Sequence, residues 1–481
     1  MAIRNICTIT REYLARQLSR AMGILFALLA SLLMPQPFIY AHVSNLSVLS
    51  QTNPGDWPTY MKDIGHSGFN ANESVLNVNT VPNLKVHWQY HVGARISSQP
   101  VVADGVVYWG SWDGYEHATT LAGQQLWRTF VGMTIPRSGC SIPPAGVAAS
   151  ATVTSISING TTTSVVIVNG GNAHVYALRA SDGSVLWSTA VGTSPDYMLW
   201  GGTTVYNGNV YTGVSSFGDC PLVTGKVVQL DASTGNILHS FNTVPTSCRG
   251  ASVWMTPTID IAEQALYVST GNKGTCKTPE TLAYALVKLS AIDLSFIDSW
   301  QLPAADQKGD NDFGSTPTLF TATISGQQRE MIGFVNKDGV YYAFDRSHIS
   351  AGPIWQFDLS SAPNNIASSA WDGTTLYTAG TLTTIKGKTC KGSVRAHDPA
   401  TGTVKWEYCA PGKIIASLAA IPGVIFAGAN NQLVALNATT GTQLFSFTDT
   451  SKQSIFWGCC TVSNGIVYAG NEAGNLFALG V

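Results

Sequence analysis

Short stretches of alternating apolar and polar residues recur along most of the chain, and each ends in a turn centred on glycine. Alternation of this kind predicts β-strands with one buried face. Many units finish on a tryptophan, as in QPVVADGVVYWGSWDGYEHATTLAGQQLW, which ends at Trp127. Their spacing of roughly 40 to 60 residues is typical of four-stranded propeller blades. The later units are VYALRASDGSVLW (ending at Trp187), VVQLDASTGNIL, LVKLSAIDLSFIDSW (Trp300), VYYAFDRSHISAGPIW (Trp355), VRAHDPATGTVKW (Trp406) and LVALNATTGTQLF (Phe445).

The two ends of the chain complete this repeat. The C-terminus stops at NLFALGV, a third strand without its turn and tryptophan strand, and LKVHWQYHVG near the start is a tryptophan strand without a unit. Pairing them predicts an all-β, eight-bladed β-propeller of four-stranded blades, closed by the N- and C-terminal strands. Such closure leaves no exposed sheet edge. We expect the strand-ending tryptophans to pack between adjacent sheets: Trp88, Trp127, Trp187, Trp355 and Trp406.

The composition agrees with one large, turn-rich β domain. The 481 residues include 47 glycines and are 45% hydrophobic but only 11% charged. A chain of this length can bury a large core, and the scarcity of charge argues against long solvated helices. The net charge of −2 gives no electrostatic footprint for nucleic acid or an anionic membrane.

The N-terminus has the pattern of an export signal. Basic residues up to Arg20 precede the apolar run Met22 to Met34, and Ala41 precedes the expected cleavage point. The alternative is a retained membrane anchor, because Pro35 to Tyr40 extends the apolar character. We therefore divide the chain into an export signal (1–41), a lead-in segment (42–84) and the propeller (85–481). The mature protein is expected in the periplasm, at the cell surface or secreted.

Eight cysteines follow this signal, and an even number in an exported chain favours disulfides. We expect Cys390 to pair with Cys409, and Cys220 with Cys248, since each pair can span neighbouring strands of one unit. A ring between the adjacent Cys459 and Cys460 would be strained, so Cys140 is an alternative partner for one of them. The sequence has no CxxCH motif for covalent haem.

The repeat resembles that of the propellers related to pyrroloquinoline-quinone (PQQ) enzymes, over nearly all of residues 54–481. The opening DWPTYMKDIGHSGFN, Asp56 to Asn70, is similar to the lead-in segment of the polyvinyl-alcohol-dehydrogenase-like subgroup. Some proteins with this repeat are scaffolds in outer-membrane protein assembly and bind no cofactor. Because a fold does not determine a function, the candidate site residues must decide.

The segment ASVWMTPTIDIAEQALYVSTGN, Ala251 to Asn272, resembles one in quinoprotein alcohol dehydrogenases. There a tryptophan forms the floor beneath the flat quinone and an asparagine ligates Ca²⁺, and Trp254 and Asn272 match these positions. An indole suits a planar cofactor, and an amide oxygen suits Ca²⁺. The alternative is a further docking tryptophan and a turn asparagine, although Trp254 opens its unit rather than closing it.

The segment PAADQKGDNDFGSTP, Pro303 to Pro317, resembles the one that bears the family's catalytic aspartate. Asp306 best matches this base, which is also a metal ligand, and Asp312 matches the second aspartate. Asp310 is an alternative because the spacing is longer than the family's. The resemblance implies a carboxylate that takes the proton of the substrate hydroxyl, whereas the alternative is a solvated acidic loop.

Three other positions complete the expected site. NKDGVYYAFDR resembles a family segment in which a cation contacts the quinone oxygens, which implies this role for Lys337. The alternative is a hairpin-turn lysine. FWGCCTVSNGIVYAG resembles a segment whose tryptophan approaches the quinone edge, which implies this place for Trp457. The family's Ca²⁺-ligating glutamate has no counterpart in SSFGDCPLVTGKV, where Asp219 is the nearest carboxylate. We expect Asp219 to replace it as a shorter hard ligand. The alternative is that Asp219 sits on a disulfide-tied loop, which would leave the metal site incomplete.

Together these resemblances imply an exported dehydrogenase that oxidises an alcohol or a polymeric alcohol with PQQ and Ca²⁺. Hydride would pass to the quinone and the proton to Asp306, and a separate acceptor such as a cytochrome would remove the electrons. The alternatives are a non-catalytic scaffold for protein or polysaccharide and a lectin-like propeller. The dehydrogenase requires the following residues to meet at one mouth of the central channel: Asp219, Trp254, Asn272, Asp306 and Lys337.

Overall fold

A computed structural model describes residues 53–481 of the chain. These residues belong to one structural unit, Ser47–Val481. The export signal predicted at residues 1–41 lies outside the described residues. The helices of the described part are two three-residue 3₁₀ turns, η1 (Val81–Asn83) and η2 (Ile349–Ala351), and none in residues 53–481 is long and apolar enough to cross a membrane.

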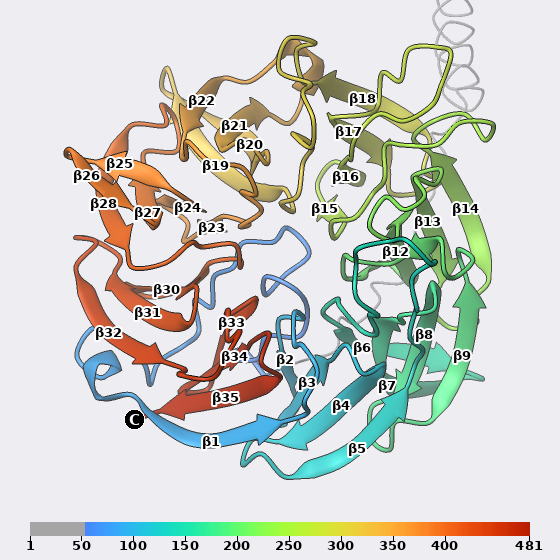
Figure 1. Ribbon diagram of the computed structural model, residues 1–481. Coiled ribbons are helices and arrows are strands. Elements are labelled where there is room, and N and C mark those ends of the chain that lie inside the picture. Colours follow the sequence, from blue (N-terminus) through green and yellow to red (C-terminus); the bar gives the residue numbers. More distant parts are fainter. Residues whose placement is uncertain (1–52) are drawn as a thin grey trace, which may run out of the picture. The chain divides into compact units, whose positions relative to one another are not determined.

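Eight antiparallel sheets of four or five strands form a ring around a central channel (Figure 1), which confirms the predicted all-β, eight-bladed propeller. We number the blades along the chain from the first complete sheet. Blade 1 contains β2 (Val101–Ala103), β3 (Val106–Gly110), β4 (Tyr115–Thr120) and β5 (Gln125–Phe130), and blade 2 contains β6 (Thr152–Ile158), β7 (Thr161–Asn169), β8 (His174–Arg179) and β9 (Val185–Ala190). Blade 3 contains β10 (Tyr197–Met198), β11 (Thr204–Tyr206), β12 (Asn209–Ser216), β13 (Lys226–Asp231) and β14 (Ile237–Asn242). Blade 4 contains β15 (Thr258–Asp260), β16 (Ala265–Ser269), β17 (Ala285–Ser290) and β18 (Phe296–Gln301).

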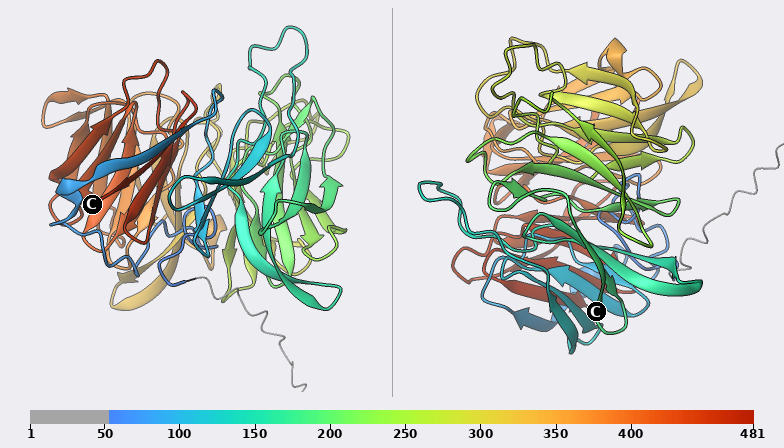
Figure 2. Two further views of the ribbon diagram at one scale, coloured as in Figure 1. Left: turned by 90° about the horizontal axis from the view of Figure 1, so that it is seen from below. Right: turned by 90° about the vertical axis from the view of Figure 1, so that its right-hand side faces the viewer.

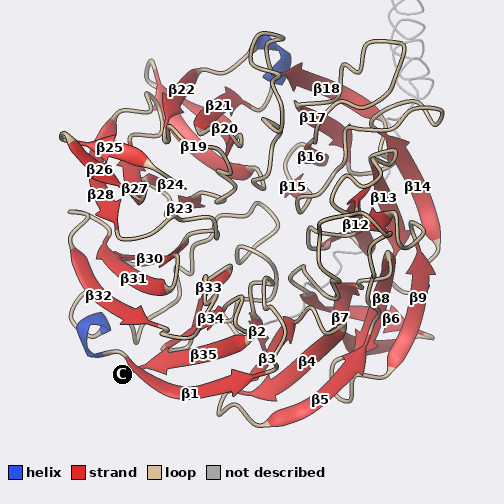
Figure 3. Cartoon of the chain, in the orientation of Figure 1, coloured by secondary structure: helices blue, strands red, loops and turns tan. Residues whose placement is uncertain are grey.

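The second half of the ring repeats this plan, with a small hairpin inserted in blade 6 (Figure 3). Blade 5 contains β19 (Thr318–Ile324), β20 (Gln327–Val335), β21 (Val340–Asp345) and β22 (Trp355–Asp358); blade 6 β23 (Ala370–Trp371), β24 (Leu376–Gly380), β27 (Gly392–His397) and β28 (Val404–Ala410), with the hairpin β25 (Thr383–Ile385) and β26 (Lys388–Cys390); blade 7 β29 (Ala419–Ile421), β30 (Val424–Ala429), β31 (Gln432–Asn437) and β32 (Gln443–Thr448); and blade 8 β33 (Gly458–Ser463), β34 (Ile466–Gly470), β35 (Asn475–Gly480) and β1 (Lys85–His91).

The ring closes in blade 8, as the two chain ends predicted. Strand β1 pairs antiparallel with β35, from Lys85 opposite Gly480 to His91 opposite Asn475. The side view in Figure 2 shows this N-terminal strand, in blue, lying along the C-terminal strands, in red. The outermost strand of blade 8 therefore comes from the start of the chain.

The five strand-ending tryptophans join neighbouring blades, which confirms their predicted packing role. Each indole nitrogen donates a hydrogen bond of 2.8–2.9 Å to a backbone carbonyl in a turn of the next blade. A glycine in that turn lies against the ring: at Gly183, where φ is +71°, an added Cβ would lie 2.6 Å from the Trp127 ring. The donors are Trp88, Trp127, Trp187, Trp355 and Trp406, and their acceptors are Leu121, Ala180, Ala232, Pro399 and Ala438.

The hydrophobic core is divided into clusters that each lie between two neighbouring sheets. One cluster, for example, joins Val101 of blade 1 to Val166 of blade 2, and another joins Tyr468 of blade 8 to Val107 of blade 1. Because each sheet buries both of its faces, inner strands can be apolar along their whole length, as in the fully buried β30. The channel-facing loops are thus carried on a rigid ring.

The lead-in segment crosses the axis of the ring, where Figure 1 shows it in blue at the centre. Its backbone carbonyls accept hydrogen bonds from the first strands of several blades, and Trp57 pairs with Val102 in blade 1. Tyr60 from this segment reaches the channel, where its hydroxyl lies 3.1 Å from that of Ser368. The carbonyl acceptors are Pro58, Ile64, Gly65, Ser67 and Gly68, bonded to Val153, Ile259, Leu319, Trp371 and Ala420 in blades 2, 4, 5, 6 and 7.

The disulfides agree only in part with the sequence-based pairing. Cys390 pairs with Cys409 as predicted. The predicted Cys220–Cys248 pair is wrong, since these residues bond to Cys140 and Cys276 respectively. The alternative of Cys140 bonding across the channel is also wrong, because Cys459 and Cys460 bond to each other. The wrongly paired cysteines Cys140, Cys220, Cys248 and Cys276 lie in loops between strands, where the strand pattern carries no information about neighbours.

Candidate functional site

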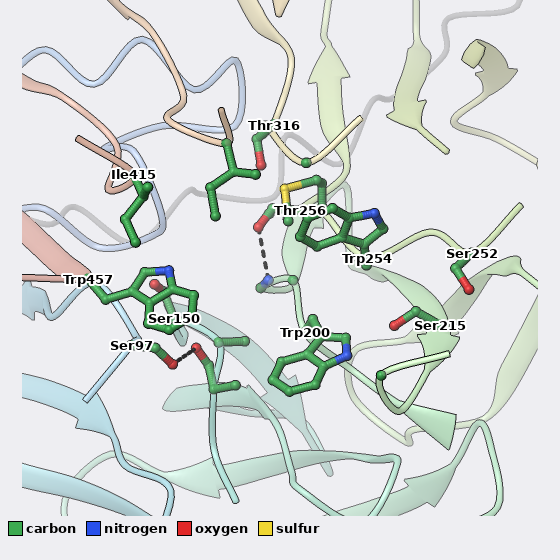
Figure 4. Close-up of a pocket in the computed structure, with 18 of the residues that line it drawn as sticks. Ser97, Ser150, Trp200, Ser215, Ser252, Trp254, Thr256, Thr316, Ile415 and Trp457 are labelled. Atoms are coloured by element: carbon green, nitrogen blue, oxygen red, sulfur yellow. Dashed lines mark hydrogen bonds between the residues drawn. The ribbon is translucent and has the colours of Figure 1, made fainter. Parts of the chain in front are cut away.

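A cavity of about 500 Å³ occupies the central channel and is lined by loops from many blades. This volume lies within the range of cofactor and small-ligand sites. Figure 4 shows the indoles of Trp200, Trp254 and Trp457 arranged around it. Of the residues predicted to form a site, Asp219, Trp254, Asn272, Lys337 and Trp457 line this cavity.

Lys337 forms the main charged contacts of the cavity wall. It follows β20, whose last residue Val335 is fully buried, so the ammonium group is presented at the edge of blade 5. Its nitrogen lies 2.5 Å from a carboxylate oxygen of Asp312 and 2.8 Å from one of Asp310. The same nitrogen lies 4.7 Å from the centroid of the Trp254 ring, a cation–π contact. One ammonium group therefore pairs with two carboxylates and also faces an indole.

The pKa values of this ion pair reflect its burial. Desolvation raises the pKa of Asp312 to about 7, although Lys337 opposes the shift; Asp310 and Asp219 add to it. Burial lowers the pKa of Lys337, but Asp312 and Asp310 outweigh this effect and the net shift is upward. Lys337 thus stays charged at neutral pH, whereas Asp312 can take up or release a proton there.

Asn272 lies beside this ion pair, and its side-chain oxygen is a free hydrogen-bond acceptor. Its side-chain nitrogen donates to Asp310 at 2.8 Å, while its side-chain oxygen is buried without a hydrogen-bond partner. The backbone bond from Ala251 to the Asn272 carbonyl holds it next to the Trp254 segment. The buried Asp312 oxygen that has no hydrogen bond is the one ion-paired with Lys337. An unpartnered amide oxygen close to carboxylates suits a hard cation.

Asp219 reaches the cavity from the loop between β12 and β13. Its backbone has a φ of +55°, and Ser216 donates a hydrogen bond to its carboxylate. It has no ion-pair partner among residues 53–481. In the same part of the chain, no group of three or more His, Cys, Asp or Glu side chains is placed to hold a metal ion.

Asp306, the residue predicted as base and metal ligand, lies outside the cavity. It is exposed on a turn in which its backbone nitrogen bonds to the Pro303 carbonyl, and it does not line the cavity. Asp310 and Asp312 do line it. Asp312 is 3% exposed and directly precedes Phe313 and Gly314, and an added Cβ at Gly314 would lie 2.4 Å from the Trp254 ring. Of the aspartates that line the cavity, Asp312 is the buried one.

Several residues of the cavity were not predicted. Trp112 packs against Trp200 with ring centroids 5.8 Å apart. The Arg95 guanidinium lies over the Trp112 ring, 4.9 Å from its centroid. The Trp112 indole nitrogen is held by Ser97 at 2.8 Å. A usable signal was present in the sequence, because Trp112 and Trp200 have glycines within two residues and do not end a strand unit.

Comparison with known proteins identifies the family. Residues 57–371 match the family described as "Glucose/ethanol/alcohol dehydrogenase, beta-propeller domain". The chain belongs to this family. Residues 336–481 also match the family described as "Outer membrane protein assembly factor BamB". This PQQ-type propeller family agrees with the resemblance inferred from the repeats.

Individual relatives are distant. A polyvinylalcohol dehydrogenase of Sphingopyxis sp. (strain 113P3) is 26% identical over 428 residues, covering 76% of this chain and 63% of that protein. The chain thus spans less than two thirds of that relative. A quinohemoprotein alcohol dehydrogenase from Comamonas testosteroni has the same fold (TM-score 0.68, 17% identity, 89% of this chain and 80% of that one). So does a europium-containing methanol dehydrogenase (TM-score 0.69, 15% identity, 89% and 98%).

Proposed function

We propose that this protein is a quinoprotein dehydrogenase that oxidises an alcohol with PQQ and Ca²⁺. The observation that carries the proposal is the position of the Lys337 ammonium, which lies against the Trp254 ring and is paired with the buried Asp312. Membership of an alcohol dehydrogenase propeller family supports the same reaction class. The aromatic cavity, with Lys337 and Arg95 in its wall, would accept a flat ligand that bears oxygen acceptors.

The residues of the cavity fit PQQ. Trp254 offers an indole face for stacking on a planar ring system. Lys337 and Arg95, both lining the cavity, offer cations for carboxylates and quinone oxygens. Trp457 lines the cavity as well and would contact the edge of the cofactor.

The residues also fit a hard cation, for which we propose Ca²⁺. The side-chain oxygen of Asn272 is buried without a hydrogen-bond partner, and one buried oxygen of Asp312 is ion-paired with Lys337. We propose these two residues as ligands, with Asp219 supplying a third side chain in place of the family's glutamate. Asp312 thereby takes the place expected for Asp306.

The chemistry assigns a role to each residue. When bound, PQQ supplies a quinone that accepts the hydride of the alcohol, and Ca²⁺ supplies a Lewis acid beside it. Asp312 would take the hydroxyl proton onto its carboxylate. Lys337 would stabilise negative charge that develops at the cavity wall. Trp254 would fix the plane in which the reaction occurs.

The substrate and partners follow as part of the proposal. The name of the Sphingopyxis relative favours a polymeric secondary alcohol, and the quinohemoprotein relatives favour a cytochrome or similar electron acceptor. We propose an acceptor that is separate from the propeller. The disulfides and the signal-like N-terminus support an exported protein.

A non-catalytic scaffold is the second candidate, since residues 336–481 match an outer-membrane assembly factor. One experiment separates the two functions. Purified protein is titrated with PQQ in Ca²⁺, and dye-linked oxidation is then measured with ethanol, 2-propanol and polyvinyl alcohol. The dehydrogenase requires saturable binding of one PQQ per chain and dye reduction with at least one alcohol. Folded protein with neither property would instead favour the scaffold.

A further inference from the structure

Two loops outside the blade sheets form one side of the cavity. The loop between β5 and β6 contributes Ile142 and Pro143, and the loop between β12 and β13 contributes Gly218 and Asp219. These loops belong to different blades, and the Cys140–Cys220 disulfide joins them across a sequence separation of 80 residues. Cys220 is the residue directly after Asp219.

Few other interactions hold the tip of the first loop. Thr134 and Ala145 exchange backbone hydrogen bonds at its base, whereas the backbone of residues 135–144 makes no bond to a sheet. Three of the residues in the tip are prolines, which cannot donate a backbone bond. The one charged contact of the tip is Arg137 with Asp196, an ion pair with side chains 57% and 25% exposed. A pair so exposed contributes little to the stability of the loop.

The second loop is similarly dependent on the disulfide. The backbone of residues 218–222 makes no hydrogen bond to a sheet; the neighbouring anchors are Phe217 to Asp196 and Val223 to Gly250. Gly218 and Asp219 both have positive φ, +66° and +55°, a conformation that costs free energy for a residue with a side chain. An added Cβ at Gly218 would lie 3.0 Å from Ile142, so the two loops are in direct contact there.

We infer that the Cys140–Cys220 disulfide is a positioning clasp, which holds Asp219 at the cavity and thereby sets the affinity of the cavity for Ca²⁺ and PQQ. This inference rests on the proposed function. Cys140 and Cys220 act through Asp219 and do not touch the ligands themselves. Removing the clasp leaves the blades intact, because neither cysteine belongs to a sheet.

The test compares two disulfide removals in the full-length protein. Calorimetry measures the Kd for Ca²⁺ and for PQQ in wild type, in C140S/C220S and in C390S/C409S, whose bridge in blade 6 does not line the cavity. We expect C140S/C220S to bind both ligands roughly tenfold more weakly or worse, as for other supports of a metal ligand. We expect C390S/C409S to bind as wild type does, with thermal melting confirming that both variants are folded.

A double-mutant cycle shows whether the clasp acts through Asp219. Asp219→Asn alone should weaken binding as much as loss of the clasp, and adding it to C140S/C220S should cause little further loss. Limited trypsin digestion supplies a readout without ligand, since the bond after Arg137 should be cut faster in C140S/C220S. Unchanged affinities in C140S/C220S, or losses that add fully with D219N, would overturn the inference. If wild-type protein fails to bind PQQ, the proposed function itself is refuted, whatever the digestion shows.

Discussion

The ammonium nitrogen of Lys337 lies 4.7 Å from the ring centroid of Trp254, and the same nitrogen is paired with the carboxylate of Asp312. These residues come from three loops, yet they converge on one wall of the channel. The arrangement places an aromatic face, a fixed cation and a proton acceptor within one cavity. The predictions below test the role of each.

The first prediction separates the two candidate bases. In protein reconstituted with PQQ and Ca²⁺, Asp312→Asn should lower kcat for alcohol oxidation by roughly 10²- to 10⁴-fold, the usual contribution of a general base. Asp306→Asn serves as the matched control and should retain kcat within a factor of about two, because Asp306 is exposed and does not line the cavity. A severe loss in D306N with an active D312N would reverse our assignment.

The second prediction concerns the ion pair in the ligand-free protein. At pH 9, where Asp312 is ionised in the wild type, Lys337→Met should leave this carboxyl buried without its cation, at a cost of roughly 3 kcal/mol in the free energy of unfolding. The double variant K337M/D312N removes the stranded charge and should recover most of this loss. Urea unfolding measures both. If K337M were as stable as wild type, the pair would not be buried as described.

The third prediction is a pH dependence at Glu116 in blade 1. Its carboxyl is fully buried, neither oxygen has a hydrogen-bond partner, and desolvation raises its pKa well above the ordinary 4.5. An acid with a raised pKa in the folded state contributes stability below its unfolded pKa and loses it as the pH rises. Glu116→Gln should therefore gain stability over wild type above pH 4.5.

The size of that gain follows from linkage. It should grow by about 1.4 kcal/mol per pH unit until the folded pKa is reached. Chemical unfolding of wild type and E116Q between pH 4 and pH 8 provides the measurement. Parallel stability curves would contradict the assignment of a neutral, buried Glu116.

The fold could be predicted from the sequence because its determinants are local. Each blade carries its own alternation, glycine turn and tryptophan, and Trp127 meets Gly183 through contacts that recur around the ring. The strand around Trp88 and the C-terminal strand each lacked a partner in the repeat, so their pairing could be predicted. In the structure β1 pairs with β35.

The site was predicted less completely, for a physical reason. Trp254, Asn272 and Lys337 sit at the ends of strands, where the repeat fixes their direction toward the channel. Asp306 and Asp312 share one long loop, and only the folded chain shows that Asp312 is buried while Asp306 faces solvent. The partner of Cys140 likewise depends on how two loops of different blades meet.

The central claim is that the cavity binds PQQ against Trp254, and calorimetric titration with PQQ in the presence of Ca²⁺ tests it most directly. We predict saturable binding of one PQQ per chain, with affinity reduced at least tenfold or so in Trp254→Ala and largely kept in Trp254→Phe, since the stacking face is what matters. Absence of PQQ binding by folded wild-type protein, or equal affinity in Trp254→Ala, would contradict the account.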